Sequence, residues 1–173
     1  QREKIILELF NQCPIPDDQI LSNLGLFLHP RDLSRLLFMD HLFKQIIDIP
    51  GIIIDFGTRW GLNMALFSAM RGIYDTFNRG RKIVGFDTFC GFPRVSEEDG
   101  MSDSVKVGNV SVPENYTKYL TALLDWHEAS NPLAHIKKYE ICVGDATIEI
   151  KKYLERNPET IVALAYFDIN LYE

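Results

Sequence analysis

The segment from Gly51 to Gly61, Gly-Ile-Ile-Ile-Asp-Phe-Gly-Thr-Arg-Trp-Gly, constrains the fold of this chain more than any other. A short β-branched run leads to an acidic residue, then to Gly57 and Gly61, and then to a helical pattern of apolar residues. This order predicts a buried parallel strand that turns tightly into a helix. Glycine is needed where the backbone bends sharply or lies against a ligand, because a Cβ atom would clash there.

The rest of the chain after Gly51 alternates between strand and helix patterns. Strands are expected at 52–56, 83–86, 139–143 and 161–167, and helices at 62–74, from 116 to about 131 and at 148–156. This alternation predicts an α/β fold with a Rossmann-like, doubly wound parallel sheet. The segment from Thr88 to Pro113, rich in Gly, Ser, Asp and Glu, is long enough to be a functional lid or a disordered loop.

Two helix patterns precede the alternating region. The first covers residues 2–10, and the second starts near Pro30, presents a broad apolar face and is broken by Pro50 and Gly51. Between them, a loop is expected through Asn23 and Gly25. We therefore expect an N-terminal helical cap over residues 1–50 and an α/β domain over residues 51–173.

The net charge and the cysteine content limit the binding partners and the cellular compartment that we expect for this protein. A formal net charge of −6 without clustered Lys and Arg argues against a nucleic-acid partner. No apolar run is long enough to cross a bilayer, so no membrane partner is expected. Cys13, Cys90 and Cys142 are odd in number and lack metal-like spacing, which predicts free thiols in a reducing cytoplasm.

Acidic residues end all of the expected strands: Asp55, Asp87, Asp145 and Asp168. Ligands of open parallel sheets bind at the edge where the carboxyl ends of the strands meet, so these carboxylates predict a negatively charged crevice there. The alternative for each is a purely structural role, because Asp is common after strands and caps the helix that follows.

The glycine spacing separates the candidate cofactors. Gly57 and Gly61 form G-x-x-x-G rather than the G-x-G-x-x-G of dinucleotide folds, which argues against NAD and FAD. A nucleoside with an amino-acid tail fits better: the helix start attracts its carboxylate, and Asp55 attracts an ammonium or a hydroxyl. Asp87 would accept the ribose hydroxyls and Asp145 the adenine amino group. This is the layout of S-adenosylmethionine in class I methyltransferases.

Two further residues near these positions have open roles. Arg59 could pair with the cofactor carboxylate, and a structural salt bridge is an equal alternative. Phe89 could stack on adenine, with core or lid packing as its equal alternative.

Four segments, at 55–61, 85–93, 144–146 and 165–173, resemble the macrocin O-methyltransferase family. The resemblance implies an S-adenosylmethionine-dependent methyltransferase that acts on sugar hydroxyls, on deoxysugar nucleotides or glycosylated natural products, commonly with Mg²⁺. It adds to the cofactor-binding set the residues Thr58, Thr88, Gly144 and Ala146. It also implies that Asp168 is a metal ligand.

The sequence departs from the family pattern in two places. Asp55 stands where the family usually has Glu, which keeps the charge. Asn170 stands where some members have an Asp as candidate base, and a neutral amide is a poor base, so the catalytic base stays unassigned.

The chain stops at Glu173, directly after the fourth expected strand, so we expect the family fold to be truncated there. The strand at 161–167 would then form an exposed edge, which favours association, and a homo-oligomer is one expectation. We also expect no turnover by this chain alone. The alternative to an enzyme is a non-catalytic cofactor-binding or interaction module derived from such a methyltransferase.

Overall fold

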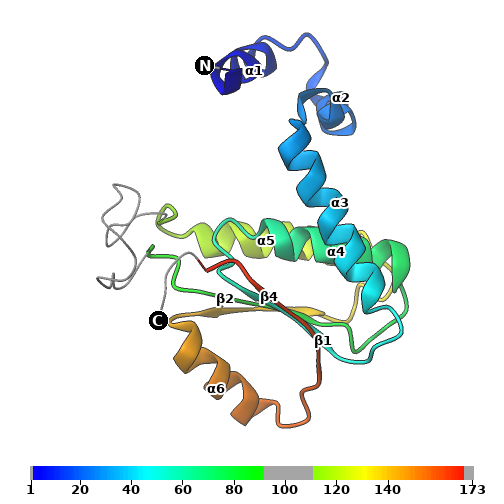
Figure 1. Ribbon diagram of the computed structural model, residues 1–173, viewed down its shortest axis with the longest axis vertical. Coiled ribbons are helices and arrows are strands. Elements are labelled where there is room, and N and C mark those ends of the chain that lie inside the picture. Colours follow the sequence, from blue (N-terminus) through cyan, green and yellow to red (C-terminus); the bar gives the residue numbers. More distant parts are fainter. Residues whose placement is uncertain (1, 92–110, 170–173) are drawn as a thin grey trace. The chain divides into compact units, whose positions relative to one another are not determined.

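The computed structural model describes residues 2–91 and 111–169 (Figure 1). The chain divides into two compact units, Gln1–Phe38 and Met39–Glu173, each described by itself below. Much of the Thr88–Pro113 segment lies outside the described residues, as does Asn170, so the lid and the base position stay predictions.

The first unit is helical. Its elements are α1 (Arg2–Asn11), α2 (Asp17–Ile20), the 3₁₀ helix η1 (Leu21–Phe27) and the first half of α3 (Pro30–Gln45). The rings of Phe10 and Phe27 meet edge to face at 5.0 Å and hold α1 against η1. The expected loop through Asn23 and Gly25 is wrong, because these residues lie in η1, whose short i→i+3 turns leave no helical periodicity in the sequence.

The second unit is built on a parallel sheet. Its strands are β1 (Ile52–Phe56), β2 (Ile83–Asp87), β3 (Tyr139–Val143) and β4 (Val162–Phe167). Among the described residues the strand order is β3-β2-β1-β4, with β1 paired to β2 and to β4 in parallel. The predicted α/β fold with a doubly wound parallel sheet and an N-terminal helical region is confirmed.

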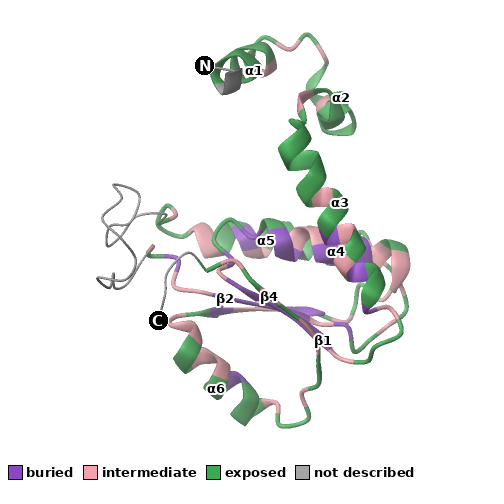
Figure 2. Ribbon diagram, viewed as in Figure 1, coloured by how far each residue is buried: buried purple, intermediate pink, exposed green. Residues whose placement is uncertain are grey.

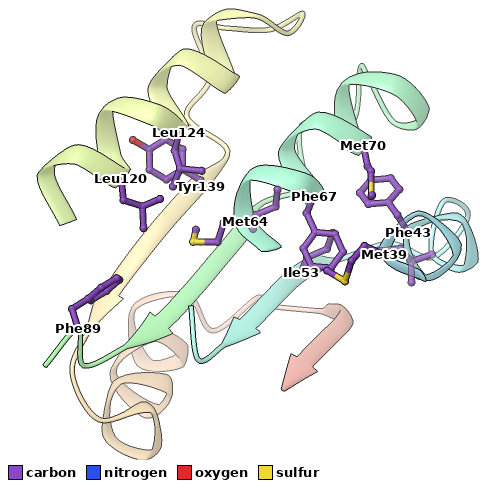
Figure 3. Close-up of a cluster of buried hydrophobic side chains, with 12 residues drawn as sticks. Met39, Phe43, Ile53, Met64, Phe67, Met70, Phe89, Leu120, Leu124 and Tyr139 are labelled. Carbon is purple, nitrogen blue, oxygen red and sulfur yellow. The ribbon is translucent and has the colours of Figure 1, made fainter. Parts of the chain in front are cut away.

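Helices cover both faces of the sheet. The helices α4 (Leu62–Tyr74) and α5 (Tyr116–Ala129) lie on one face, and α6 (Ala146–Arg156) lies on the other (Figure 1). Side chains of α4 and α5 form the larger core cluster with residues of the sheet, and α4 runs between α5 and the end of α3 (Figure 3). This places the first turns of α4 and α5 beside the carboxyl ends of β1 and β2.

The C-terminal half of α3 belongs to the core of the second unit. Met39, Phe43 and Ile46 are buried there, and the Phe43 ring contacts Phe67 on α4 at 6.4 Å. The two compact units therefore divide within α3. The assignment of residues 1–50 to a cap and 51–173 to a cofactor domain stays a prediction.

A buried ion network joins α4, α5 and the start of β3. Arg71 pairs with Glu128, which also pairs with Lys138 Nζ at 2.7 Å. Arg71 Nη1 donates to the carbonyl oxygen of Lys138 at 2.9 Å, and all three side chains are buried. A buried charge without a partner is costly, so this network fixes how α5 lies against α4.

The cysteines are free thiols, as expected. Burial raises the pKa of the Cys142 thiol to about 11, which leaves it protonated and unreactive at neutral pH. None of the described helices combines the length and the apolar character needed to cross a membrane.

Candidate functional site

The turn between β1 and α4 is the centre of the candidate site. The Gly57 N–H donates to the Phe86 carbonyl at 2.9 Å, and the Gly61 N–H donates to the Thr58 carbonyl at 2.7 Å. Gly57, Arg59 and Gly61 have left-handed backbones, with φ of +86°, +45° and +76°. The chain therefore reverses within a few residues and delivers the start of α4 to the sheet edge.

Both glycines of this turn lie tightly against neighbouring parts of the protein. A Cβ atom on Gly57 would overlap the carbonyl oxygen of Asp168, at the end of β4. A Cβ atom on Gly61 would overlap the side chain of Leu120 on α5. The sequence predicts close approach of a cofactor to these glycines, and that role stays a prediction beside the packing reason that the structure gives.

Asp55, one residue before the end of β1, is a fully buried carboxylate. Asn63 Nδ2, in the first turn of α4, donates to Asp55 Oδ1 at 2.9 Å. Asp55 Oδ2 is buried and has no hydrogen-bond partner among the described residues. Burial raises the pKa of Asp55 to about 6, and the hydrogen bond from Asn63 acts in the opposite direction.

Asp87 ends β2 and joins two turns. Its Oδ2 accepts the backbone N–H of Arg59 at 2.8 Å, and its Oδ1 accepts the backbone N–H of Phe89 at 2.6 Å. Phe89, like Arg59, has a left-handed backbone, with φ of +56°. The Asp87 carboxylate thus stabilises strained conformations in the turns after β1 and after β2.

Asp168 follows β4 and completes an acidic group. Its N–H donates to the Phe56 carbonyl at 2.8 Å, which places it beside the end of β1. The negative charges of Asp168 and Asp87 both raise the pKa of Asp55 further. The structure therefore brings three of the four expected carboxylates into one electrostatic environment at the sheet edge.

Asp145 caps α6. Its Oδ1 accepts the Thr147 N–H at 2.9 Å and the Thr147 hydroxyl at 2.6 Å. Capping is the structural alternative considered for this residue, and the contact with adenine stays a prediction. The neighbouring Gly144 donates its N–H to the Asp87 carbonyl at 2.9 Å, and Ala146 packs on the core beneath α6, so this turn adjoins the end of β2.

The remaining expected residues support the turns. The Thr58 hydroxyl donates to the Asp55 carbonyl at 3.2 Å, and the Thr88 hydroxyl donates to the Gly91 carbonyl at 2.9 Å. Phe89 is buried in the larger core cluster, as Figure 3 shows, which is the packing alternative for its ring. The Arg59 guanidinium lies 5.5 Å from the centre of the Trp60 ring.

Two residues of the site were not predicted from the sequence. Asn63 is the partner of Asp55, and its signal is a lone amide among the apolar residues of the first turn of α4. Tyr116 donates its hydroxyl to the Trp60 carbonyl at 2.9 Å and ties α5 to the glycine turn. Nothing local in the sequence connects Tyr116 with Trp60.

Metal-binding residues do not gather within residues 2–91 and 111–169. No group of three or more His, Cys, Asp or Glu side chains in these ranges could hold a metal ion. The assignment of Asp168 as a metal ligand therefore stays a prediction.

Solved structures of CalS11 resemble this chain over nearly its whole length. The crystal structure of CalS11, a calicheamicin methyltransferase, is 41% identical, with a TM-score of 0.95, and the match covers 99% of this chain and 67% of that one. This chain belongs to the CalS11 family of methyltransferases. The apo structure of CalS11, named there as a TDP-rhamnose 3′-O-methyltransferase of calicheamicin biosynthesis, is 37% identical, with a TM-score of 0.84.

The second match covers 99% of this chain and 66% of that one, so this member of the CalS11 family spans about two thirds of the length of both structures. No protein-family model matches the chain, and no curated protein matches it.

Proposed function

We propose that this chain is the cofactor-binding part of an S-adenosylmethionine-dependent O-methyltransferase that acts on a hydroxyl of a deoxysugar nucleotide, as in the macrocin O-methyltransferase family. The single observation that carries the proposal is the 41% identity to CalS11 over 99% of the chain. The acceptor class follows from the naming of CalS11 as a TDP-rhamnose 3′-O-methyltransferase.

The buried carboxylate of Asp55 fits this cofactor. Burial of the Asp55 carboxylate with Oδ2 unpartnered makes its ionised form unfavourable and raises its pKa to about 6. A cationic ligand group beside Oδ2 would stabilise the ionised form. The cofactor carries such a group in the ammonium of its amino-acid tail. When bound, S-adenosylmethionine supplies a methyl group on a sulfonium centre.

The start of α4 and the Asp87 carboxylate supply the complementary contacts. The N-cap of α4 is Gly61, which offers no side-chain cap, so the first N–H groups of the helix remain suited to a carboxylate. Each Asp87 oxygen accepts one backbone N–H and can accept a second hydrogen bond, here from a ribose hydroxyl.

None of the described residues is proposed as the base that deprotonates the acceptor hydroxyl. Asp55 is buried beneath the glycine turn and hydrogen-bonded by Asn63, which suits cofactor binding better than proton transfer to an acceptor. Within residues 2–91 and 111–169, no group of three or more His, Cys, Asp or Glu side chains is placed to hold Mg²⁺.

Titration calorimetry tests the cofactor. We expect S-adenosylmethionine and S-adenosylhomocysteine to bind, with NAD as the matched nucleotide control that gives no heat. Binding of NAD without binding of either adenosyl compound would remove the proposal.

Methyl transfer from radiolabelled donor tests the acceptor, with TDP-rhamnose, a glycosylated polyketide and a simple catechol as candidates. We expect no turnover by this chain alone, so label on the sugar nucleotide would support the proposed substrate class and show that this expectation is wrong. Label on the catechol alone would show that the sugar assignment is wrong while leaving cofactor binding intact.

A further inference from the structure

The turn between β1 and α4 holds three left-handed residues, and one of them is not glycine. Gly57 and Gly61 have φ of +86° and +76°, and Arg59 between them has φ of +45°. A side chain in this region crowds its own backbone, a cost that glycine avoids. Residues held in such conformations cluster at functional sites. A long side chain at a position where glycine would be less strained therefore indicates a role for that side chain.

The backbone of Arg59 is bound by the protein, whereas its guanidinium group is not. The N–H of Arg59 donates to Asp87 Oδ2 at 2.8 Å. The guanidinium lies over the Trp60 ring, 5.5 Å from its centre. It makes no ion pair or hydrogen bond with any residue in 2–91 or 111–169. The structural salt bridge considered for Arg59 from the sequence is thus not found among these residues, and its N–H donors remain available to a ligand.

The aromatic ring beneath the guanidinium is itself fixed by α5. The Trp60 carbonyl accepts the Tyr116 hydroxyl at 2.9 Å, and the two rings meet edge to face at 5.0 Å. A guanidinium over an aromatic ring can still donate from its edge to a planar or tetrahedral oxyanion. Because the ring limits the freedom of the Arg59 side chain, less entropy is lost when that side chain binds an anion.

Arg59 is a basic residue on an acidic edge of the sheet. The central strands β1 and β2 are buried along almost their whole length (Figure 2), so charged groups reach this edge from the strand ends and the segments that follow. Within the described segments that follow the four strands, 57–61, 88–91, 144–145 and 168–169, Arg59 is the only Lys or Arg. The carboxylates at the strand ends and in these segments are Asp55, Asp87, Asp145 and Asp168. An anion that approaches this edge is repelled by them, and Arg59 compensates.

The proposed reaction brings two anions to this edge. The carboxylate of the cofactor has the first N–H groups of α4 as its partners, because the N-cap Gly61 provides no side-chain cap. The diphosphate of a sugar nucleotide carries more negative charge, and the described segments after the strands offer it no cation except Arg59. The guanidinium fork matches phosphate oxygens and binds them with two parallel hydrogen bonds.

We propose that Arg59 binds the diphosphate of the sugar-nucleotide acceptor and thereby selects nucleotide-linked sugars over free sugars and glycosides. Trp60 is a positioning residue that holds the guanidinium. This role rests on the proposed function, which supplies the acceptor class. It differs from pairing of Arg59 with the cofactor carboxylate in the ligand whose affinity depends on Arg59.

Phosphorus NMR titration with thymidine diphosphate, with and without saturating S-adenosylhomocysteine, measures binding at the proposed contact. Arg59→Gln should raise the dissociation constant of thymidine diphosphate roughly tenfold or more, because charge-assisted bidentate hydrogen bonds are lost. Arg59→Lys keeps the charge without the fork and should be intermediate. The calorimetric affinity for S-adenosylhomocysteine should change less than about threefold, since the helix start binds its carboxylate.

Arg59→Gly separates ligand binding from folding. Glycine relieves the left-handed strain, so this variant should unfold at a urea concentration no lower than wild type although it binds thymidine diphosphate as weakly as Arg59→Gln. Two variants control for net charge. Arg79→Gln removes a charge from the segment before β2, at the opposite edge of the sheet, and should leave both affinities unchanged. Lys118→Gln removes one from the first turn of α5 and should have a smaller effect than Arg59→Gln.

The outcomes distinguish this role from the proposed function. If the wild-type chain binds S-adenosylhomocysteine but binds thymidine diphosphate not at all, or equally well in Arg59→Gln, the role of Arg59 is wrong and the cofactor assignment stands. Loss of S-adenosylhomocysteine affinity alone in Arg59→Gln would assign Arg59 to the cofactor carboxylate instead. An equal loss in Lys118→Gln would show a diffuse charge effect and contradict a specific contact. If S-adenosylhomocysteine does not bind the wild-type chain, the proposed function fails, and the titration without it still decides the role of Arg59.

Discussion

Asn63 Nδ2 donates a 2.9 Å hydrogen bond to Asp55 Oδ1, and both side chains are buried at the end of β1. The bond holds one oxygen of the carboxylate and leaves Oδ2 without a partner among the described residues. Because the hydrogen bond favours the charged form, Asn63 keeps Asp55 more acidic than burial alone would make it.

Asn63→Leu should raise the pKa of Asp55 by roughly one to two pH units, because a hydrogen bond to a charged group contributes about 1.5–3 kcal/mol. Carbon-detected NMR titration of the aspartate carboxyl groups measures this directly. We expect S-adenosylhomocysteine to bind more weakly at pH 7, with partial recovery at higher pH as Asp55 ionises. Ser68→Ala, at another buried polar position of α4, is the control and should leave the titration of Asp55 unchanged. A loss of affinity that does not vary with pH would contradict this role.

The pH dependence of stability should carry a signature of Asp55. Its pKa is raised from 3.8 to about 6, so between these values the folded protein retains a proton that the unfolded chain has lost. The free energy of unfolding therefore falls by an amount on the order of 3 kcal/mol as the pH rises through this window. Above the window it no longer changes with the ionisation of Asp55. Asp55→Asn removes this dependence. Urea unfolding of both proteins at pH 4, 5 and 7.5 checks it, and a wild-type-to-variant difference that stays constant with pH would show that Asp55 titrates normally.

Asp87→Ala should weaken both the fold and the proposed cofactor site. The Arg59 and Phe89 N–H groups lose their acceptor, and two left-handed turns lose the contact that stabilises them. We expect a loss of about 1.5–3 kcal/mol in the free energy of unfolding and at least tenfold weaker binding of S-adenosylhomocysteine. Asp87→Asn keeps one carbonyl oxygen and should be intermediate in both. Equal stability of Asp87→Ala and wild type in urea would show that these hydrogen bonds contribute nothing measurable.

Two substitutions of Asp145 can separate its role as a helix cap from its proposed role in cofactor binding. Asp145→Ser keeps a good helix cap, whereas Asp145→Ala loses it and should cost about 1 kcal/mol. If Asp145 also contacts adenine, both variants bind S-adenosylhomocysteine more weakly although only Asp145→Ala is destabilised. Unchanged calorimetric affinity in both variants would restrict Asp145 to capping.

The elements of the second unit were largely predictable because their signals are local. The strands at 52–56 and 139–143 and the helix at 62–74 have the expected bounds, since β-branched runs and apolar periodicity end at Gly, Pro or acidic residues. The 3₁₀ helix η1 was missed because its seven residues show no such period. The acidic strand ends also predicted a shared carboxylate environment, which the structure shows for Asp55, Asp87 and Asp168 but not for Asp145, the cap of α6.

The parts of the site that the sequence did not predict depend on contacts between distant residues. Asn63 is close to Asp55 only because the glycine turn brings α4 back over the strand. Gly57 faces the end of β4, more than a hundred positions later in the chain, which no local pattern encodes. The buried pair of Arg71 and Glu128 likewise gives no signal in sequence, where charged residues predict a solvated surface.

The contact between Gly57 and Asp168 leads to the last prediction. Gly57 has φ of +86°, which costs a residue with a side chain about 1–2 kcal/mol, and a Cβ atom there would overlap the Asp168 carbonyl. Because that carbonyl is backbone, Gly57→Ala must displace the end of β4 or the turn. We therefore expect a loss of stability above about 2 kcal/mol.

Two alanine variants serve as controls. Gly61→Ala should cost less, because the Leu120 side chain that it meets can move, although φ of +76° still opposes it. In Gly80→Ala the nearest atom lies at an ordinary 3.4 Å, so this variant should be nearly neutral. Urea unfolding of the three variants measures the order of their stabilities. If Gly57→Ala is as stable as Gly80→Ala, the end of β4 does not pack against the glycine turn, and Asp168 is not held beside Asp55.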